Sequence, residues 1–234
     1  MDAEATADGQ AVDPGKVDVG VGAAVALNLA DLTNHAYIAS SAEVDSTGLT
    51  VQADMAPRSG ETTATHTFKA DATSGAGDAS ADVGIAGSFA MNLVDNTTSA
   101  TIVTGADVDA GGGAVNVLAG NTTSHTADAS SDAGGDVGIG ASVALNILDT
   151  NDTVAEVQNG SLLTDAGAVA VQATAAHTIT TTTLAGAAGA DVAISPSVAI
   201  TIADSNTEAR IGTSATKLDA DSVNVSAIHK NAMA

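Results

Sequence analysis

The sequence of this 234-residue chain predicts an all-β protein built from repeats, and three observations lead to that prediction. A fourteen-residue motif with Asp at both ends occurs four times. Larger apolar residues alternate with Gly and Ala inside the motif, and a period of two is that of a β-strand. Aromatic residues make up only 1% of the chain, so its core must be thin and built from small side chains.

The motif reads D-V-G-I-G-A-S-V-A-L-N-I-L-D in its clearest copy. Its four copies are Asp18–Asp31, Asp82–Asp95, Asp136–Asp149 and Asp191–Asp204, whose starting positions differ by 64, 54 and 55. This spacing predicts a single array with a partial repeat at 1–17 and repeats at 18–81, 82–135, 136–190 and 191–234, the last incomplete. Because residues 3–17 resemble the segments that precede later motifs, we expect a section of a longer array.

Each motif predicts one strand. In the first copy one face carries Val19, Val21, Ala23, Val25, Leu27 and Leu29, which are mostly large and apolar, and the other carries Gly20, Gly22, Ala24, Ala26 and Asn28. We expect Val, Leu, Ile and Ala to be buried between repeats. We also expect the Gly and Ala face to approach another backbone layer closely, because Gly permits such contact.

A Thr- and Asn-rich turn, a short strand, a second turn, a second alternating strand and a His follow each motif. The first repeat has ten extra residues near Met55 and Pro57, which predict a loop leaving the array. In the fourth motif, Pro196 lacks the backbone N–H that a ladder needs, so we expect a bulge or altered pairing there.

A 54-residue repeat can be folded in more than one way. Three coils of about 18 residues would give a right-handed parallel β-helix, which the short strand–turn cadence favours. Four arms of about 13 residues, suggested by the spacing of Asp82, Asp95 and Asp109, would suit a long antiparallel β-hairpin array or larger coils. The parallel β-helix is our predicted fold, and the hairpin array is the alternative.

Charge and composition limit the partners. The formal net charge is −22, which excludes ordinary nucleic-acid binding and disfavours anionic lipid. No apolar stretch is long enough for a transmembrane helix, so we expect no membrane insertion. Cysteine is absent, so neither disulfides nor thiolate metal sites can form. The partners we expect are neighbouring repeats, in the same or in identical chains, and host or surface glycans.

The chain resembles a known class of repeats. The motif V-G-I-G-A-S-V-A-L-N, the segment N-T-T-S-A-T-I-V-T-G-A-D-V and the strand A-G-G-G-A-V-N-V-L-A are similar to repeats of very large bacterial surface adhesins, the filamentous-haemagglutinin-like and leukotoxin-like proteins. The resemblance covers nearly the whole chain. It implies a secreted β-helical stalk, extracellular or at the bacterial cell surface, exported by machinery outside this segment. The fourth repeat departs from the pattern at Ser195-Pro196 and at Thr201, which replaces Asn.

Recurrent aspartates are the candidate metal ligands. Asp95, Asp109, Asp149 and Asp165 close strands at equivalent points of two repeats, and stacked carboxylates repel one another unless a cation such as calcium intervenes. Asp also caps turns by accepting backbone N–H bonds, and no known calcium-loop motif is present. Turn capping is therefore the preferred interpretation, and calcium is the one cofactor that these aspartates suggest.

One His follows the second strand of each repeat: His66, His125, His177 and His229. We expect them to share a register, so a 54-residue coil would stack them as neighbours, whereas 18-residue coils would hold them roughly 14 Å apart, too far for one metal. We expect solvated turn residues and not ligands.

The sequence predicts a non-enzymatic function. It contains no nucleophile elbow, phosphate-binding loop or zinc-protease motif, and no carboxylate pair stands out among its 28 acidic residues. We expect a structural or adhesive segment forming a rigid acidic stalk. The alternatives are a calcium-stabilised, self-associating extracellular filament or matrix protein, and a β-helical carbohydrate-active enzyme.

Overall fold

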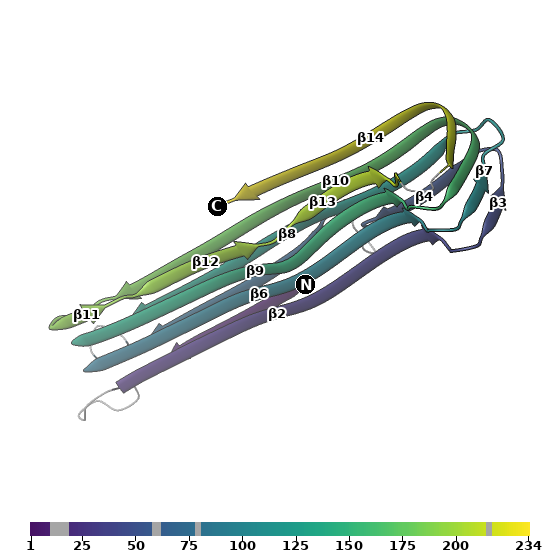
Figure 1. Ribbon diagram of the computed structural model, residues 1–234. Helices are drawn as coiled ribbons and strands as arrows, with labels where there is room; N and C mark the ends of the chain where they lie inside the picture. The colour runs from purple at the N-terminus through teal and green to yellow at the C-terminus, as the bar shows by residue number, and fades with distance from the viewer. Residues whose placement is uncertain (10–18, 58–61, 78–80, 214–216) are drawn as a thin grey trace.

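A computed structural model describes residues 1–9, 19–57, 62–77, 81–213 and 217–234, and its regular secondary structure is entirely β-strand (Figure 1). The strands are β1 (Asp2–Gly9), β2 (Val19–Ile38), β3 (Glu43–Asp45), β4 (Leu49–Asp54), β5 (His66–Ala76), β6 (Val83–Ile102), β7 (Asp107–Asp109), β8 (Val115–Ala133), β9 (Val137–Val157), β10 (Leu162–Ala187), β11 (Val192–Ile194), β12 (Ser197–Ala203), β13 (Asn206–Ile211) and β14 (Lys217–Met233). The predicted all-β class is confirmed.

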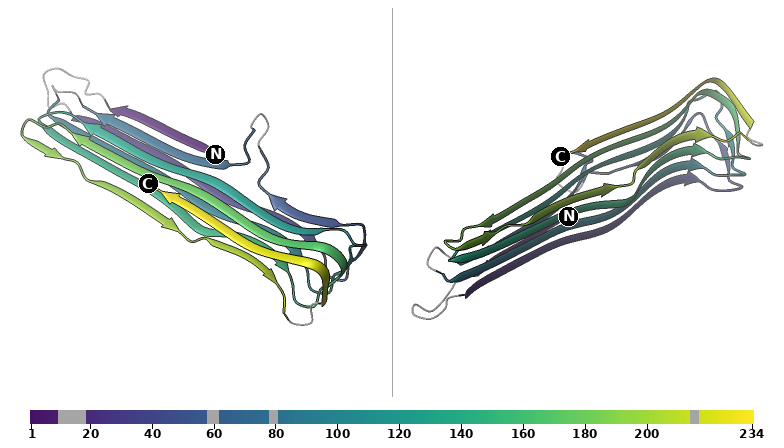
Figure 2. Two further views of the ribbon diagram at one scale, coloured as in Figure 1. Left: turned by 90° about the horizontal axis from the view of Figure 1, so that it is seen from above. Right: turned by 60° about the vertical axis from the view of Figure 1, so that its left-hand side comes forward.

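The long strands form two layers that run lengthwise through the molecule (Figures 1 and 2). One layer, the motif sheet, has the order β2-β6-β9, with β11, β12 and β13 along the free edge of β9. The other, the return sheet, has the order β1-β5-β8-β10-β14, and short strands β3, β4 and β7 extend it. Every pairing among the described strands is parallel, so the antiparallel hairpin array is not the arrangement adopted.

Each complete repeat contributes one long strand to each sheet. Val83 of β6 pairs with Val137 of β9, and Val115 of β8 pairs with Val169 of β10, so the partners in both sheets lie one whole repeat apart in the sequence. Of the two coil sizes that the sequence left open, about 18 and about 54 residues, the structure has the larger, with one coil for each repeat. Buried and less buried side chains alternate from the motif through the Thr- and Asn-rich segment. This segment therefore extends β6 to Ile102 as one strand and does not form the predicted turn.

The insertion in the first repeat leaves the return sheet between β4 and β5. Asp54 pairs with Gly120 and His66 pairs with Thr123, so two pairings twelve positions apart in the first repeat are only three positions apart on β8. The sheet keeps its parallel pairing on both sides, as expected for a loop that leaves the array. Part of this insertion, residues 58–61, lies outside the described ranges.

The interior faces of the motif strands carry the small residues. Ala24 and Ala26 of β2 are buried, whereas Val21 and Val25 are 62% and 58% exposed. The expected burial of Val, Leu and Ile is therefore wrong for the outward face of the motif, but it holds for Val94 and Leu148 at the end of the motif and for the return sheet. The alternation correctly separated two faces, but the interior is the Gly and Ala face.

Close contact between the two sheets explains why the Gly and Ala face of the motif is the interior one. A Cβ atom on Gly140 of β9 would lie 2.0 Å from the carbonyl oxygen of Gly186, and one on Gly22 would lie 2.0 Å from that of Gly75. No Cβ fits at Gly22 or Gly140, so the expected close approach of backbone layers is confirmed there, whereas Ala86, which pairs with both, is buried beside Ala76 and Ala133. Toward the end formed by β3 and β7 the space widens, and larger residues such as Ile102, Leu163 and Val157 are fully buried.

Two irregularities interrupt the motif sheet. Val94 pairs with Leu148 but Asp95 pairs with Thr150, which places one extra residue of β9 in a bulge. In the fourth repeat the strand is interrupted between β11 and β12 at Ser195 and Pro196, although the Pro196 carbonyl still accepts the N–H of Ser142 at 3.1 Å, and the register with β9 is the same on both sides. The altered pairing predicted at Pro196 is confirmed, and it takes the form of a gap without a shift.

Candidate functional site: polar rows between the two sheets

A row of buried asparagines joins successive repeats across the motif sheet. Asn28, Asn92 and Asn146 occupy equivalent positions on β2, β6 and β9. The Nδ2 of Asn28 donates to Oδ1 of Asn92 at 2.9 Å, and the Nδ2 of Asn92 donates to Oδ1 of Asn146 at 2.8 Å. Each side chain is 2% exposed or less. The row satisfies polar groups that burial would otherwise penalise.

The same asparagines also hold the two sheets together. The Nδ2 groups of Asn28, Asn92 and Asn146 donate to return-sheet carbonyl oxygens at 2.6, 2.8 and 2.7 Å. Thr201 replaces Asn in the fourth repeat, and its hydroxyl lies 2.6 Å from Oγ1 of Thr181. A Thr hydroxyl therefore extends the row to the fourth repeat.

A second row crosses between the sheets. The Nδ2 of Asn96 on β6 donates to Oδ1 of Asn121 on β8, and the Nδ2 of Asn121 donates to Oδ1 of Asn151 on β9, both at 2.9 Å. Asn151 continues to the hydroxyl of Ser205 at 3.3 Å. The second row thus links three repeats through alternate sheets.

Two histidines lie in the interior beside this row. Nε2 of His125 and Nδ1 of His177 are each 2.8 Å from Oγ1 of Thr123, which can donate to one ring and accept from the other. The Phe68 ring stacks on His125 with centroids 5.0 Å apart. Burial lowers the pKa of His125 to about 4 and that of His177 to about 4, with smaller contributions from the neighbouring histidines. Both rings are therefore neutral at pH 7.

The predicted shared register of the histidines is wrong. His177 pairs with Thr123, and His125 pairs with Ile179, a displacement of two residues. The prediction of solvated turn positions is also wrong for these two rings, which are 1% and 3% exposed within strands. His229 is exposed, with its ring centroid 5.6 Å from that of His177. Among the described residues, no group of three or more His, Cys, Asp or Glu could hold a metal ion.

The candidate calcium ligands are spread over two places. Asp95 lies in β6 beside Asp31, and its Oδ1 accepts a hydrogen bond from the backbone N–H of Thr150 at 3.1 Å. Asp149 is the extra residue of the β9 bulge, so it is out of register with Asp95. The bulge therefore interrupts the carboxylate row that the motif spacing suggested.

The other two candidates lie at the opposite turn. Asp109 pairs with Asp45 and Thr164, and its Oδ1 accepts a hydrogen bond from the N–H of Gly111 at 3.0 Å. This bond is the turn-capping contact that the sequence favoured for Asp. Asp165 follows in a left-handed backbone conformation, with φ of +49°, outside the register of the row.

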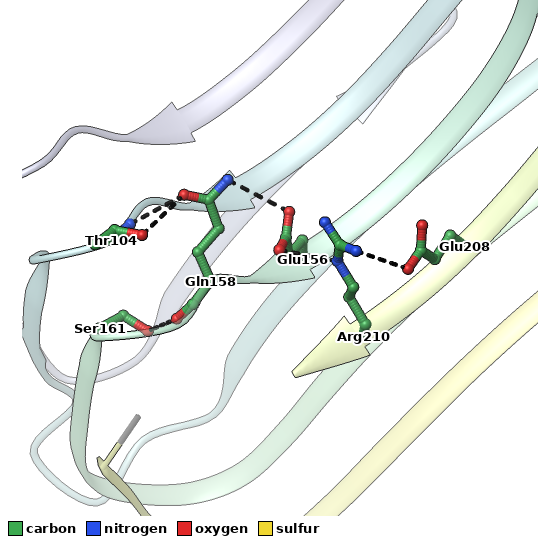
Figure 3. Close-up of polar contacts among 6 residues, drawn as sticks. All are labelled: Thr104, Glu156, Gln158, Ser161, Glu208 and Arg210. Atoms are coloured by element: carbon green, nitrogen blue, oxygen red, sulfur yellow. Dashed lines mark hydrogen bonds and ion pairs between the residues drawn. The ribbon is translucent and has the colours of Figure 1, made fainter. Parts of the chain in front are cut away.

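A charged cluster on the outer side of the motif sheet joins the third and fourth repeats (Figure 3). Arg210 contacts Glu156 at 2.9 Å and Glu208 at 3.0 Å, and its pKa is raised mainly by its hydrogen bond to Glu156. Gln158 donates to Glu156 and accepts from Thr104. The sequence reasoning missed this cluster, although Glu156 and Arg210 lie one repeat apart in the sequence.

The two asparagine rows, the buried histidine pair and the charged cluster all link neighbouring repeats, and the asparagine rows also link the two sheets. No protein-family model, curated protein or solved structure matches this chain. The described residues include no helix with the length and hydrophobicity needed to cross a lipid bilayer.

Proposed function

We propose that this chain is a structural repeat segment of a secreted bacterial surface adhesin, folded as a right-handed parallel β-solenoid that acts as a rigid acidic stalk. The observation that carries the proposal is the in-register stacking of equivalent residues of successive repeats in both sheets. Right-handedness follows from the strong preference of parallel crossover connections. The resemblance to adhesin repeats supports the surface location.

The polar rows support a mechanical role. Backbone ladders bind each repeat only to its neighbours, and the rows of Asn28 and Asn96 add side-chain bonds in the same direction. In repeat arrays such nearest-neighbour contacts add one stabilising interface for each repeat, so the array extends regularly. A net charge of −22 keeps a structure of this kind soluble.

Inserting a second copy of residues 136–190 after residue 190 tests the architecture. The array should lengthen by one strand spacing, about 4.8 Å, with an unchanged length along the strands. Small-angle X-ray scattering measures both dimensions, and the thermal midpoint should rise because one more interface is added. An inserted copy that protrudes as an unfolded segment would contradict the proposal.

The proposed location has a separate test. Antibodies raised against the chain should label intact cells of the source bacterium as strongly as permeabilised cells. Labelling only after permeabilisation would place the protein inside the cell and overturn the adhesin assignment. It would leave the repeat architecture unaffected.

A further inference from the structure

The outer side of the motif sheet presents a continuous apolar surface, which we call the apolar face. It consists of the outward side chains of β2, β6, β9, β11 and β12 over the length of the motif. These are the odd-numbered positions of residues 19–29, 83–93 and 137–147, and the even-numbered positions of β11 and β12. Apart from Gly87, every one of them carries an apolar side chain.

The apolar face is accessible to solvent in the described structure. Leu29 is 60% exposed on β2, Ile85 is 39% exposed on β6, and Ile202 is 53% exposed on β12. The motif strands of β2, β6 and β9 pack their inner sides against the return sheet, and no described strand lies over their outer sides (Figure 2). Exposed apolar patches of more than a few hundred Å² usually mark interaction sites.

The apolar face has the size of a stable protein interface. Four strands spaced about 4.8 Å apart and eleven residues at about 3.3 Å each give a flat area of roughly 700 Å². A standard protein–protein interface buries about 800 Å² on each partner. One flat partner covering the whole face would therefore be enough.

Charge distribution distinguishes this face from the rest of the surface. None of its side chains is charged, although the chain carries −22 overall. The acids begin at its borders, with Asp31 and Asp95 at one end and Asp82 and Asp136 at the other. On the far side of the molecule, the return sheet presents Glu4, Asp71 and Asp128 in one row.

We propose that the apolar face is the interface with a second copy of this chain, packed sheet against sheet. A second copy presents a flat, uncharged surface of the same outline, and two sheets pack face to face at about 10 Å. A two-fold arrangement buries both apolar faces at once and leaves both acidic return sheets in solvent. The bordering acids and the net charge oppose binding to an anionic membrane instead.

Sedimentation analysis of the intact chain tests the pairing. The wild-type chain should sediment with about twice its 22.4 kDa mass, and the dimer should tighten as NaCl screens the acids at its borders. Val143→Asp places a charge at the centre of the apolar face and should make the chain monomeric. Thr174→Asp, at an exposed central position of the return sheet, is the matched control and should remain dimeric.

Cysteine protection locates the interface, because the chain has no natural cysteine. The thiol of Ala141→Cys, on the apolar face, should react more slowly with a maleimide as protein concentration rises. The thiol of Ala170→Cys, on the outer side of the return sheet, should react at one rate throughout. Circular dichroism and thermal midpoints would verify that all four variants fold.

Three results would overturn the proposal. They are a monomer at high protein concentration, a Val143→Asp chain that pairs like the wild type, and a monomeric Ala141→Cys chain whose thiol is protected by zwitterionic phosphatidylcholine vesicles. None of them bears on the repeat insertion or on surface labelling, so failure here is distinguishable from failure of the proposed function.

Discussion

Glycine sets the closest approach of the two sheets. At Gly140 the opposing atom is a backbone oxygen, which cannot move aside as the end of a flexible side chain could. At Gly87, on the outer side of β6, no atom lies within 4 Å of an added Cβ. The two glycines therefore lie in the same sheet, but only Gly140 is placed against the backbone of the opposite sheet.

This difference gives a prediction at single residues. Gly140→Ala should lower the free energy of unfolding by roughly 3 kcal/mol or more, because the sheets must separate. Gly87→Ala should leave it unchanged or raise it by about 0.5 kcal/mol, because Ala restricts the unfolded chain and fits a strand better. Urea denaturation of both variants, done where the wild type is monomeric, measures the contrast. Equal effects would mean that the sheets are not held this closely.

The buried histidines make stability depend on pH. Their pKa values fall to about 4 in the folded chain, against 6.5 for an ordinary His. Between these pH values the unfolded chain binds more protons, so acid favours unfolding. The stability that neutral rings provide is complete above about pH 6.5 and is lost as pH falls toward 4.

We predict that His125→Phe weakens this pH dependence. Phe can keep the stacking on Phe68 but cannot bind a proton. Between pH 7.5 and pH 5 the variant should lose about 2 kcal/mol less unfolding free energy than the wild type. His35→Phe, at an exposed outer position of β2, is the control and should lose as much as the wild type. Urea denaturation at both pH values checks this, and matching losses in all three proteins would contradict it.

At the scale of an element, the asparagine row ties each motif strand to the next one and to the opposite sheet. Asn92 is the central member, since it accepts from Asn28 and donates to Asn146 and to the carbonyl of Thr126. Removing it takes away the side-chain donor to Oδ1 of Asn146 and to the carbonyl of Thr126, whereas Nδ2 of Asn28 keeps its bond to the carbonyl of Lys69.

We predict that Asn92→Ala costs about 2 to 4 kcal/mol of unfolding free energy, since unsatisfied buried groups cost about 1 to 3 kcal/mol each and a small cavity adds to them. Asn116→Ala, on the outer side of β8, breaks only an exposed 3.4 Å contact with Thr50 and should change stability by less than about 0.5 kcal/mol. Chemical denaturation of both variants compares them. Similar small losses would show that the row contributes little.

The sequence could predict strands and repeats at this scale, but not which face of a motif strand is interior. Alternation in β2 separates Val25 from Ala26 equally well in either orientation. Hydrophobicity favours burying Val25, and the close approach of the return sheet at Gly75 reverses that preference. Because this constraint comes from residues distant in the sequence, the alternation of residues within the strand cannot reveal it.

The polar rows were only partly predictable. The recurrence of Asn28, Asn92 and Asn146 is visible in the sequence, but their burial depends on the reversed orientation of the strand. For the histidines a signal was present, because the sequence numbers of His125 and His177 differ by 52 whereas those of residues paired between β8 and β10 differ by 54.

The bulge at Asp149 also leaves a trace in the sequence. Ala90 and Ala144, which pair before the bulge, differ by 54 in sequence number, whereas Ala100 and Ala155, which pair after it, differ by 55. The motif alone does not show this change, because the extra residue follows its last apolar position. Comparing only the motifs therefore aligned Asp149 with Asp95.

For the whole molecule, repulsion among 28 acidic residues opposes the compact state. Screening reduces this repulsion irrespective of which cation is added. Asp95 and Asp149 are separated by the bulge, and Asp109 already accepts the N–H of Gly111. The four candidate aspartates are therefore not arranged as one chelating group.

We predict that added NaCl raises the thermal midpoint and that CaCl₂ at equal ionic strength raises it no further. Melting in a chelator at constant ionic strength should match melting without it. Differential scanning calorimetry of the wild-type chain measures all three conditions. A calcium-specific rise that Asp95→Asn or Asp109→Asn abolishes would restore the calcium-stabilised alternative.

The offset of one whole repeat between neighbouring strands also determines the proportions of any assembly built this way. Each repeat adds about 4.8 Å in the stacking direction, whereas a 20-residue strand such as β6 spans roughly 66 Å at right angles to it. Four repeats therefore extend several times farther along the strands than in the stacking direction. About fourteen would be needed before length equals width. Each added repeat therefore contributes a long strip of surface to both sheets but very little extension in the stacking direction.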